Sequence, residues 1–141
     1  MTYPPTYLGS GDPARRHTDY YPAWLDNLAD DATVEGAAMD GAAQGAEAVR
    51  EIVVTAKTLY EYQDFNFAGP YGDNGFLEDY TTQVHGEPLG VVVTVTRNAA
   101  GQTQHLVVNH RPRSSMLLVS RLLGEKFAGT PYAKHFAASE S

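Results

Sequence analysis

The sequence of 141 residues contains no cysteine. This absence excludes disulfide bonds, thiol nucleophiles and cysteine-ligated metal sites, whichever compartment the protein occupies. Long apolar runs are also missing, so no segment has the continuous hydrophobic stretch of a signal sequence or of a membrane-spanning helix. We therefore expect a cytoplasmic protein with no membrane partner.

Positive charge is scarce. The chain has 10 Lys and Arg against 17 Asp and Glu, which gives a formal net charge of −7. Nucleic acids and anionic membranes select basic surfaces, so this balance argues against both as partners. Hydrophobic residues, in contrast, make up 43% of the chain, which is typical of a globular protein. A chain of this length suits one domain with one core.

Proline and glycine indicate where regular structure begins and ends. They are concentrated in residues 1–11, which we expect to form an irregular N-terminal arm. A single domain is expected over residues 12–128, and residues 129–141 are expected to form a loose tail. We find no internal repeat and no low-complexity linker.

The first part of the domain has helical signals. Asp12 followed by proline is an N-cap with proline at the first helical position, which predicts a short helix over 13–21. Pro22 interrupts it and begins a second short helix over 22–29. Apolar residues at spacings of three and four predict a long amphipathic helix over 45–60.

The second part alternates polar and apolar residues, which predicts antiparallel strands joined by turns. The expected strands are 59–67, 76–85, 91–96 and 102–110, with a turn over 86–90. After Pro112 an amphipathic helix is expected over about 113–127. Helices, then one curved sheet, then a closing helix predict an α+β layer fold.

Two motifs resemble a known superfamily. "ADDATVE" at 29–35 and "GAEAVREI" at 45–52 are similar to ketosteroid isomerase and to the wider nuclear transport factor 2-like, or SnoaL-like, superfamily. The resemblance runs without a gap from about Pro22 to Lys57 and more loosely to His110. It implies a cone-shaped, curved antiparallel (mixed) sheet wrapped around N-terminal helices, with an apolar pocket inside. It also implies a homodimer formed through the outer face of the sheet. The extra C-terminal helix departs from the isomerase.

The catalytic residues that the isomerase resemblance implies are not present at the matching positions of this sequence. The resemblance implies a catalytic aspartate directly after "ATVE", where this chain has Gly36. A second aspartic acid falls on Val93, and a helical tyrosine falls on Val53. Proton transfer needs an acid or base within hydrogen-bond reach, so steroid isomerisation by that mechanism is not expected.

The same register predicts which side chains face the pocket, because residues two apart on a strand share a face. The expected substrate-binding residues are Val53, Phe76, Thr82, Val91, Val93, Val95, Leu106, Val108 and Trp24. The expected catalytic residues are Glu78, His110 and Tyr80. No metal is expected, because His105 and His110 fall on opposite strand faces and no third ligand follows.

Glu78 is the informative residue. A carboxyl among apolar neighbours is desolvated, which raises its pKa toward the range useful for acid–base chemistry. A buried glutamate needs a partner, and we expect His110 and Tyr80 to provide it. The alternative is that Glu78 lies one residue out of register, on the outer face beside an arginine.

Three functions remain open at this point. The first is a cofactor-independent acid–base enzyme, of isomerase, dehydratase, cyclase or epoxide hydrolase type, acting on an apolar oxygenated small molecule. The second is a non-catalytic binding protein for a hydrophobic small molecule. The third is a dimerisation or partner-docking module.

Overall fold

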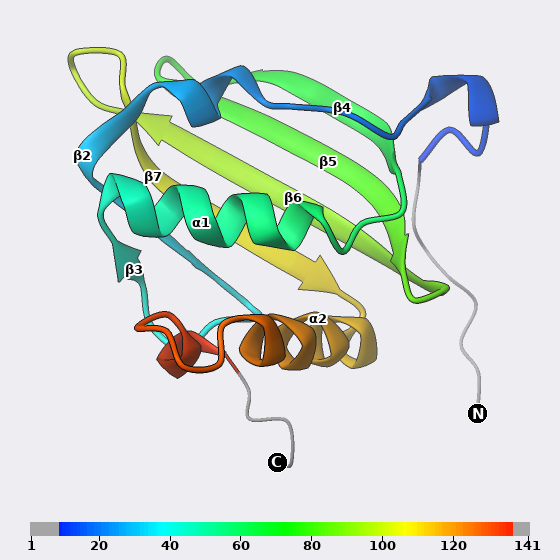
Figure 1. Cartoon of the computed structure of the whole chain (residues 1–141). Helices are drawn as coiled ribbons and strands as arrows, with labels where there is room; N and C mark the ends of the chain where they lie inside the picture. Colours follow the sequence, from blue (N-terminus) through cyan, green and yellow to red (C-terminus); the bar gives the residue numbers. More distant parts are fainter. Residues whose placement is uncertain (1–8, 137–141) are drawn as a thin grey trace.

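The computed structural model describes residues 9–136, which form a curved seven-stranded sheet with two α-helices on its concave side (Figure 1). The helices are α1 (Ala46–Lys57) and α2 (Arg113–Lys126). The strands are β1 (Arg16–His17), β2 (Leu28–Gly36), β3 (Ala43–Gln44), β4 (Gln63–Tyr71), β5 (Gly75–Val84), β6 (Glu87–Arg97) and β7 (Thr103–Arg111). The expected α+β class is confirmed.

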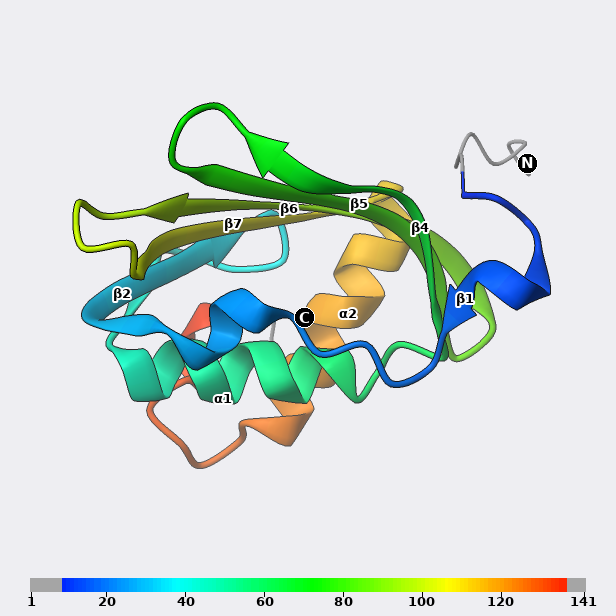
Figure 2. The same ribbon diagram turned by 90° about the horizontal axis from the view of Figure 1, so that it is seen from above.

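The sheet is mixed. Its strand order is β1-β4-β5-β6-β7-β2-β3, and only the β2–β7 pair is parallel among the described strands. Figure 2 shows that the curved sheet covers one side of α1 and α2. No helix in residues 9–136 is long and apolar enough to cross a membrane.

Side-chain alternation sets the inner face of the sheet. In β6, Val91, Val93 and Val95 are buried while the residues between them are half-buried. Glu78 pairs with Val93, and Val93 pairs with Val108, so these side chains share one face. The predicted inner face is therefore the one that packs against the helices.

The prediction of two N-terminal helices is wrong. Asp12 does act as an N-cap, since its side chain accepts a hydrogen bond from Ala14 N at 2.9 Å, but only a 3₁₀ turn η1 (Pro13–Arg15) follows. The chain then pairs with β4 through β1, which uses the backbone groups that a helix would need. The sheet consequently wraps around α1 and α2, not around N-terminal helices.

The segment after Pro22 is a second 3₁₀ turn, η2 (Ala23–Asp26), which buries Trp24 and Leu25. It ends because the chain joins the sheet: Thr103 N donates to Asn27 O at 2.7 Å, and β2 begins at Leu28. Parallel pairing with β7 has overridden the local helical pattern.

Two strand boundaries also differ from expectation. β4 begins at Gln63 because turns follow the end of α1. β6 begins at Glu87 because the preceding hairpin turns on His85 and Gly86 alone, with φ angles of 51° and 77°. Two central residues with positive φ give the turn whose twist matches that of paired strands.

The C-terminal helix forms as predicted, with Val119, Leu122 and Leu123 buried against the rest of the domain. The expected loose tail does not begin at residue 129, however. A short 3₁₀ turn η3 (Ala133–His135) follows, and Phe136 is stacked on Phe127 with ring centroids 5.7 Å apart. These apolar contacts hold the segment as far as Phe136; residues 137–141 lie outside the described part.

The N-terminal segment from residue 9 to 22, which we call the strap, crosses from the edge of the sheet to α1 (Figure 2). Residues 1–8 of the expected arm lie outside the described part; residues 9–11 have no regular secondary structure. The strap is anchored by Asp64, whose carboxylate accepts hydrogen bonds from Ser10 N, Ser10 Oγ and Gly11 N at 3.1, 2.7 and 2.9 Å.

Asp64→Asn is expected to release this end of the strap. Burial acts to raise the pKa of Asp64, but the hydrogen bonds from Ser10 and Gly11 lower it overall, so the folded protein favours the carboxylate. That stabilisation is present above the unfolded pKa of about 3.9 and is lost as pH falls through the lower folded pKa. At neutral pH we expect urea denaturation to show a loss of about 1–3 kcal/mol.

The matched control is Asp19→Asn, an exposed strap carboxylate, which should leave stability unchanged. As the pH falls through the lowered folded pKa of Asp64, its carboxylate becomes protonated and the two variants should converge. An Asp64→Asn variant as stable as the wild type at neutral pH would contradict the anchoring role.

Candidate functional site

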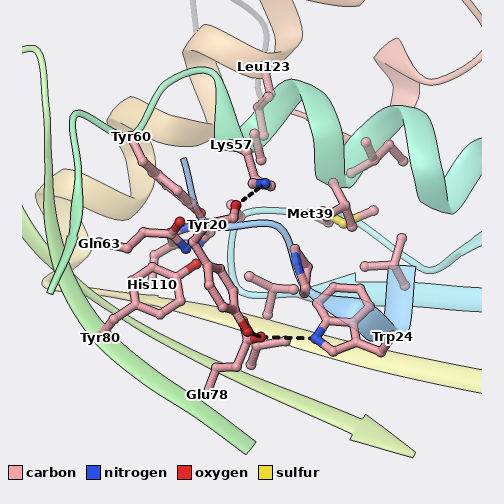
Figure 3. A pocket seen from close by; sticks show the side chains of 18 of the residues that line it. Tyr20, Trp24, Met39, Lys57, Tyr60, Gln63, Glu78, Tyr80, His110 and Leu123 are labelled. Carbon is pink, nitrogen blue, oxygen red and sulfur yellow. Dashed lines mark hydrogen bonds between the residues drawn. The ribbon is translucent and has the colours of Figure 1, made fainter. Parts of the chain in front are cut away.

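A cavity of about 50 Å³ lies on the concave side of the sheet (Figure 3). Apolar side chains come from α1, α2 and the C-terminal segment, with Val53, Leu123 and Phe136 among them. Polar groups come from the strap, the end of α1, and β4, β5 and β7. The volume is well below the roughly 300 Å³ at which sites for drug-sized ligands begin, so the cavity in this form admits a small group only.

Glu78 lies in the wall of this cavity and is only 2% exposed. Its Oε2 atom accepts two hydrogen bonds, from the Tyr20 hydroxyl at 2.6 Å and from Trp24 Nε1 at 3.0 Å (Figure 3). Within residues 9–136, Oε1 receives no hydrogen bond. One carboxyl oxygen is therefore fixed, and the other is available to a ligand.

Two opposing effects act on the Glu78 proton. Burial raises the pKa of Glu78, and this effect prevails over the hydrogen bonds from Tyr20 and Trp24 and the positive charge of Lys57, which lower it. The group is thus easier to protonate than an exposed glutamate, while its carboxylate form still has donors in place.

Glu78 is buried in the pocket, but the prediction that His110 and Tyr80 are its partners is wrong. His110 contacts Tyr60 instead, with Nε2 2.7 Å from the Tyr60 hydroxyl. Tyr80 lies edge-on to Tyr60, with ring centroids 5.9 Å apart. Tyr20 takes the place next to Glu78 because the strap crosses the open side of the cavity.

Tyr60, Tyr80 and His110 form a second polar group in the same cavity. Burial lowers the pKa of His110 to about 4, so the imidazole is neutral at physiological pH. Burial also raises the pKa of Tyr60 and of Tyr80, so both hydroxyls stay protonated. His110 Nδ1 is buried without a hydrogen-bond partner in the described part of the chain, which leaves this group with unused hydrogen-bonding capacity.

The cavity takes up part of the predicted site. The predicted residues that line it are Trp24, Val53, Glu78, Tyr80, Val93, Val108 and His110. The predicted residues Phe76, Thr82, Val91, Val95 and Leu106 do not. They belong to the same face of the sheet, but the strands are longer than the cavity, and the remaining length packs into the core. Thr82, for example, is 1% exposed and donates its hydroxyl to Tyr62 O.

The prediction missed the polar lining residues Tyr20, Lys57, Tyr60 and Gln63. It also missed apolar lining residues, namely Pro22, Val34, Ala38, Met39, Ile52, Ala56, Leu123 and Phe136. Lys57 and Tyr60 continue the helical face of Ile52, Val53 and Ala56, so helical spacing contained a signal for them. Tyr20 had no such signal, because its position depends on where an irregular segment crosses the sheet.

Gly36 cannot carry the side chain that the isomerase resemblance implies. It pairs with Val108 in the parallel β2–β7 contact. A Cβ atom there would lie 1.8 Å from the carbonyl oxygen of Val108. At the position where the resemblance implies the catalytic aspartate, the backbones of β2 and β7 therefore lie too close together for a side chain.

The two histidines of β7 lie on opposite faces, as predicted. His105 is on the outer face, where Nδ1 is 2.5 Å from Thr33 Oγ1 and Nε2 is 3.0 Å from Glu35. Within the described residues, no cluster of three or more His, Asp or Glu side chains is arranged to hold a metal ion.

Solved structures share this architecture. A steroid delta-isomerase from Pseudomonas aeruginosa is 19% identical over 74% of this chain and 77% of its own, with a TM-score of 0.68. A protein with a cystatin-like fold from Silicibacter pomeroyi is 14% identical over 75% and 74%, with a TM-score of 0.69. An NTF2-like protein of unknown function from Cytophaga hutchinsonii is 18% identical over 64% and 75%, with a TM-score of 0.50.

The chain has the nuclear transport factor 2-like fold. The resemblance drawn from the two sequence motifs is confirmed at this level. No protein-family model matches the sequence, and no curated protein does. Because this fold hosts many activities, the function of this nuclear transport factor 2-like domain has to be argued from its own cavity.

Gly36→Ala is expected to destabilise the domain, because the added Cβ forces β2 away from β7. We expect a loss of at least about 1–3 kcal/mol in urea denaturation. Glu35→Ala, on the same strand with a half-exposed side chain, is the control and should cost less. Gly36→Asp should be destabilised as well and should gain no steroid isomerase activity; a stable, active Gly36→Asp variant would refute the close approach.

Glu78→Gln is expected to stabilise the protein at alkaline pH. A raised folded pKa means that Glu78 contributes its full stability below the unfolded pKa of about 4.3 and loses it as pH rises through the folded pKa. Glutamine keeps an oxygen for Tyr20 and Trp24 and has no charge to desolvate. Chemical denaturation at about pH 8 should therefore favour the variant, and the difference should shrink toward pH 4. A variant less stable at both pH values would contradict the raised pKa.

Proposed function

We propose that the protein is a cofactor-independent enzyme in which Glu78 transfers protons to and from a small, largely apolar molecule that carries oxygen. Isomerases, dehydratases, cyclases and epoxide hydrolases all need such a group. The observation that carries the proposal is the state of Glu78: a buried carboxyl with Oε2 held by two donors and Oε1 without a hydrogen bond in the described chain, facing a mostly apolar cavity.

The two carboxyl oxygens have different roles in this proposal. Tyr20 and Trp24 fix the plane of the carboxyl through Oε2, which directs Oε1 toward the ligand. As an acid, Glu78 gives a proton from Oε1 to a ligand oxygen; as a base, Oε1 takes one from carbon or water. The same two donors stabilise the carboxylate after it has lost its proton, so both protonation states are supported.

The Tyr60–Tyr80–His110 group would bind the ligand oxygen on which negative charge develops. All three side chains are neutral near pH 7, and neutral donors in a mostly apolar cavity stabilise such an oxygen without themselves requiring a counter-ion. Trp24, Val53, Val93 and Val108 supply the apolar contact that holds the rest of the molecule.

Homodimerisation through the outer sheet face and a cytoplasmic location belong to the same proposal. Support for the dimer comes from half-buried apolar side chains on that face, namely Leu77, Val92 and Val107. Sedimentation at increasing concentration tests it, with Val92→Asp expected to give a monomer.

A non-catalytic binding protein is the second candidate. Two features favour it: the Tyr20 hydroxyl already donates a hydrogen bond to Glu78, and the cavity around them is small. Such a protein would bind the same class of ligand without turnover.

The test uses the single tryptophan of the chain, Trp24, as a reporter in the cavity wall. Small ketones and epoxides that change its fluorescence are incubated with the enzyme in D₂O. NMR then measures deuterium incorporation next to the carbonyl, or diol formation from the epoxide. Glu78→Gln is expected to lower the rate by at least about 100-fold, because the proton-transfer group is lost.

Glu51→Gln, on the exposed face of α1, is the matched control and should retain the wild-type rate. Turnover that survives in Glu78→Gln would overturn the assignment of Glu78. Ligands that bind with no turnover by the wild type would favour the binding protein instead.

A further inference from the structure

A second hollow, of about 290 Å³, lies outside the cavity. The strap lines one side of it, from His17 to Tyr21, and the end of α1 lines another, at Val54, Lys57 and Thr58. Tyrosine is the commonest side chain in this lining, so its walls offer both apolar rings and hydroxyl groups.

The hollow and the cavity are neighbours. Tyr20, Lys57, Tyr60 and Gln63 line both of them. The wall between the two spaces therefore consists of side chains that can change rotamer. The cavity alone is too small for most ligands, whereas the two spaces joined together reach the size of ordinary small-molecule sites.

Lys57 is the one cation that lines both spaces in the described structure. Its Nζ donates to the carbonyl oxygen of Tyr20 and lies 5.0 Å from the centre of the Tyr21 ring. No carboxylate of residues 9–136 is within 4.0 Å of it. Its strongest contact is thus to a neutral backbone acceptor, and burial lowers the pKa of Lys57.

We propose that the hollow and the cavity form one two-part site for an amphiphilic carboxylic acid. The carboxylate binds Lys57 in the outer hollow, and the apolar end of the molecule enters the cavity beside Glu78. This inference names the ligand class of the proposed function and rests on it only for the location of the reacting group.

The charges around Lys57 favour a single negative charge on the ligand. Asp19 lines the same hollow, and the whole chain carries a net charge of −7. One lysine opposed by these charges suits a monoanion better than a phosphate dianion. Tyr62 also lines the hollow, and its hydroxyl can donate to the second carboxylate oxygen.

Binding would also open the wall between the two spaces. A carboxylate is a stronger acceptor than a peptide carbonyl, so the ligand would replace the Tyr20 carbonyl on Lys57. That exchange releases one of the contacts that hold Tyr20 over Glu78. The acid group is therefore expected to give access to the cavity as well as affinity.

The experiment compares hexanoate, octanoate and cinnamate with their primary amides, and adds hexylphosphonate. Calorimetry measures affinity, and Trp24 fluorescence reports whether the apolar end reaches the cavity. The acids are expected to bind about 5- to 10-fold more tightly than the amides, a modest factor because Lys57 is partly exposed to solvent. Lys57→Met should abolish this difference between acids and amides, whereas Lys126→Met, an exposed lysine at the end of α2, should preserve it.

Three results would overturn the inference: equal binding of acids and amides, a preference for acids that survives in Lys57→Met, or tighter binding of the phosphonate than of the carboxylates. Its failure is distinguishable from that of the proposed function. Lysine-dependent binding of acids without any turnover refutes only the enzyme, and turnover of neutral ketones without a preference for acids refutes only the ligand class.

Discussion

The arrangement of the site depends on the burial of one carboxyl group. Glu78 lies in the middle of β5, opposite Val93, where every strand neighbour on the inner face is apolar or aromatic. A carboxyl in that position is costly unless donors reach it, and the sheet itself offers none from its side chains. The donors come from Tyr20 and Trp24, on a segment that is distant in sequence. Glu78 therefore determines where the strap must cross the sheet.

The need of Glu78 for hydrogen-bond donors links the stability of the fold to the entry of a ligand into the cavity. Tyr20 and Trp24 donate hydrogen bonds to Glu78 and, at the same time, form part of the cavity wall. The strap has little regular structure of its own, and it is fixed at Asp64 near one end and by the burial of Trp24 and Leu25 just beyond the other. Between these anchors the strap pairs with β4 through β1, and Tyr20 contacts Glu78, Lys57 and the Phe65 ring. Local opening of this part costs less than unfolding the sheet, so ligand entry is compatible with an intact core.

Sequence reasoning succeeded where local pattern and tertiary structure agree. The alternation of Val91, Val93 and Val95 placed Glu78 on the inner face, and helical spacing located α1 and α2. It failed at residues 13–29, where capping and turn signals for helices are real but strand pairing with β4 and β7 uses the backbone instead. The partner of Glu78 was missed for the same reason. A hydrogen bond between residues 58 apart in sequence, one of them in an irregular segment, leaves no periodic signal.

Geometry explains both why residue 36 carries no acidic side chain and how Glu78 can take a place in the cavity wall. At Gly36 the backbone of β2 approaches Val108 so closely that no side chain fits, so an acidic group at that edge of the cavity is excluded by geometry. β5 lies two strands away from β7 across the same concave face, and a glutamate there reaches the cavity from the other side. The carboxyl group on β5 lies beside Tyr20 of the strap and Lys57. A carboxyl group at residue 36 would instead lie at the contact between β2 and β7. The fold thus retains its pocket while the polar groups shift toward the strap, which is where a charged end of a ligand can remain close to solvent.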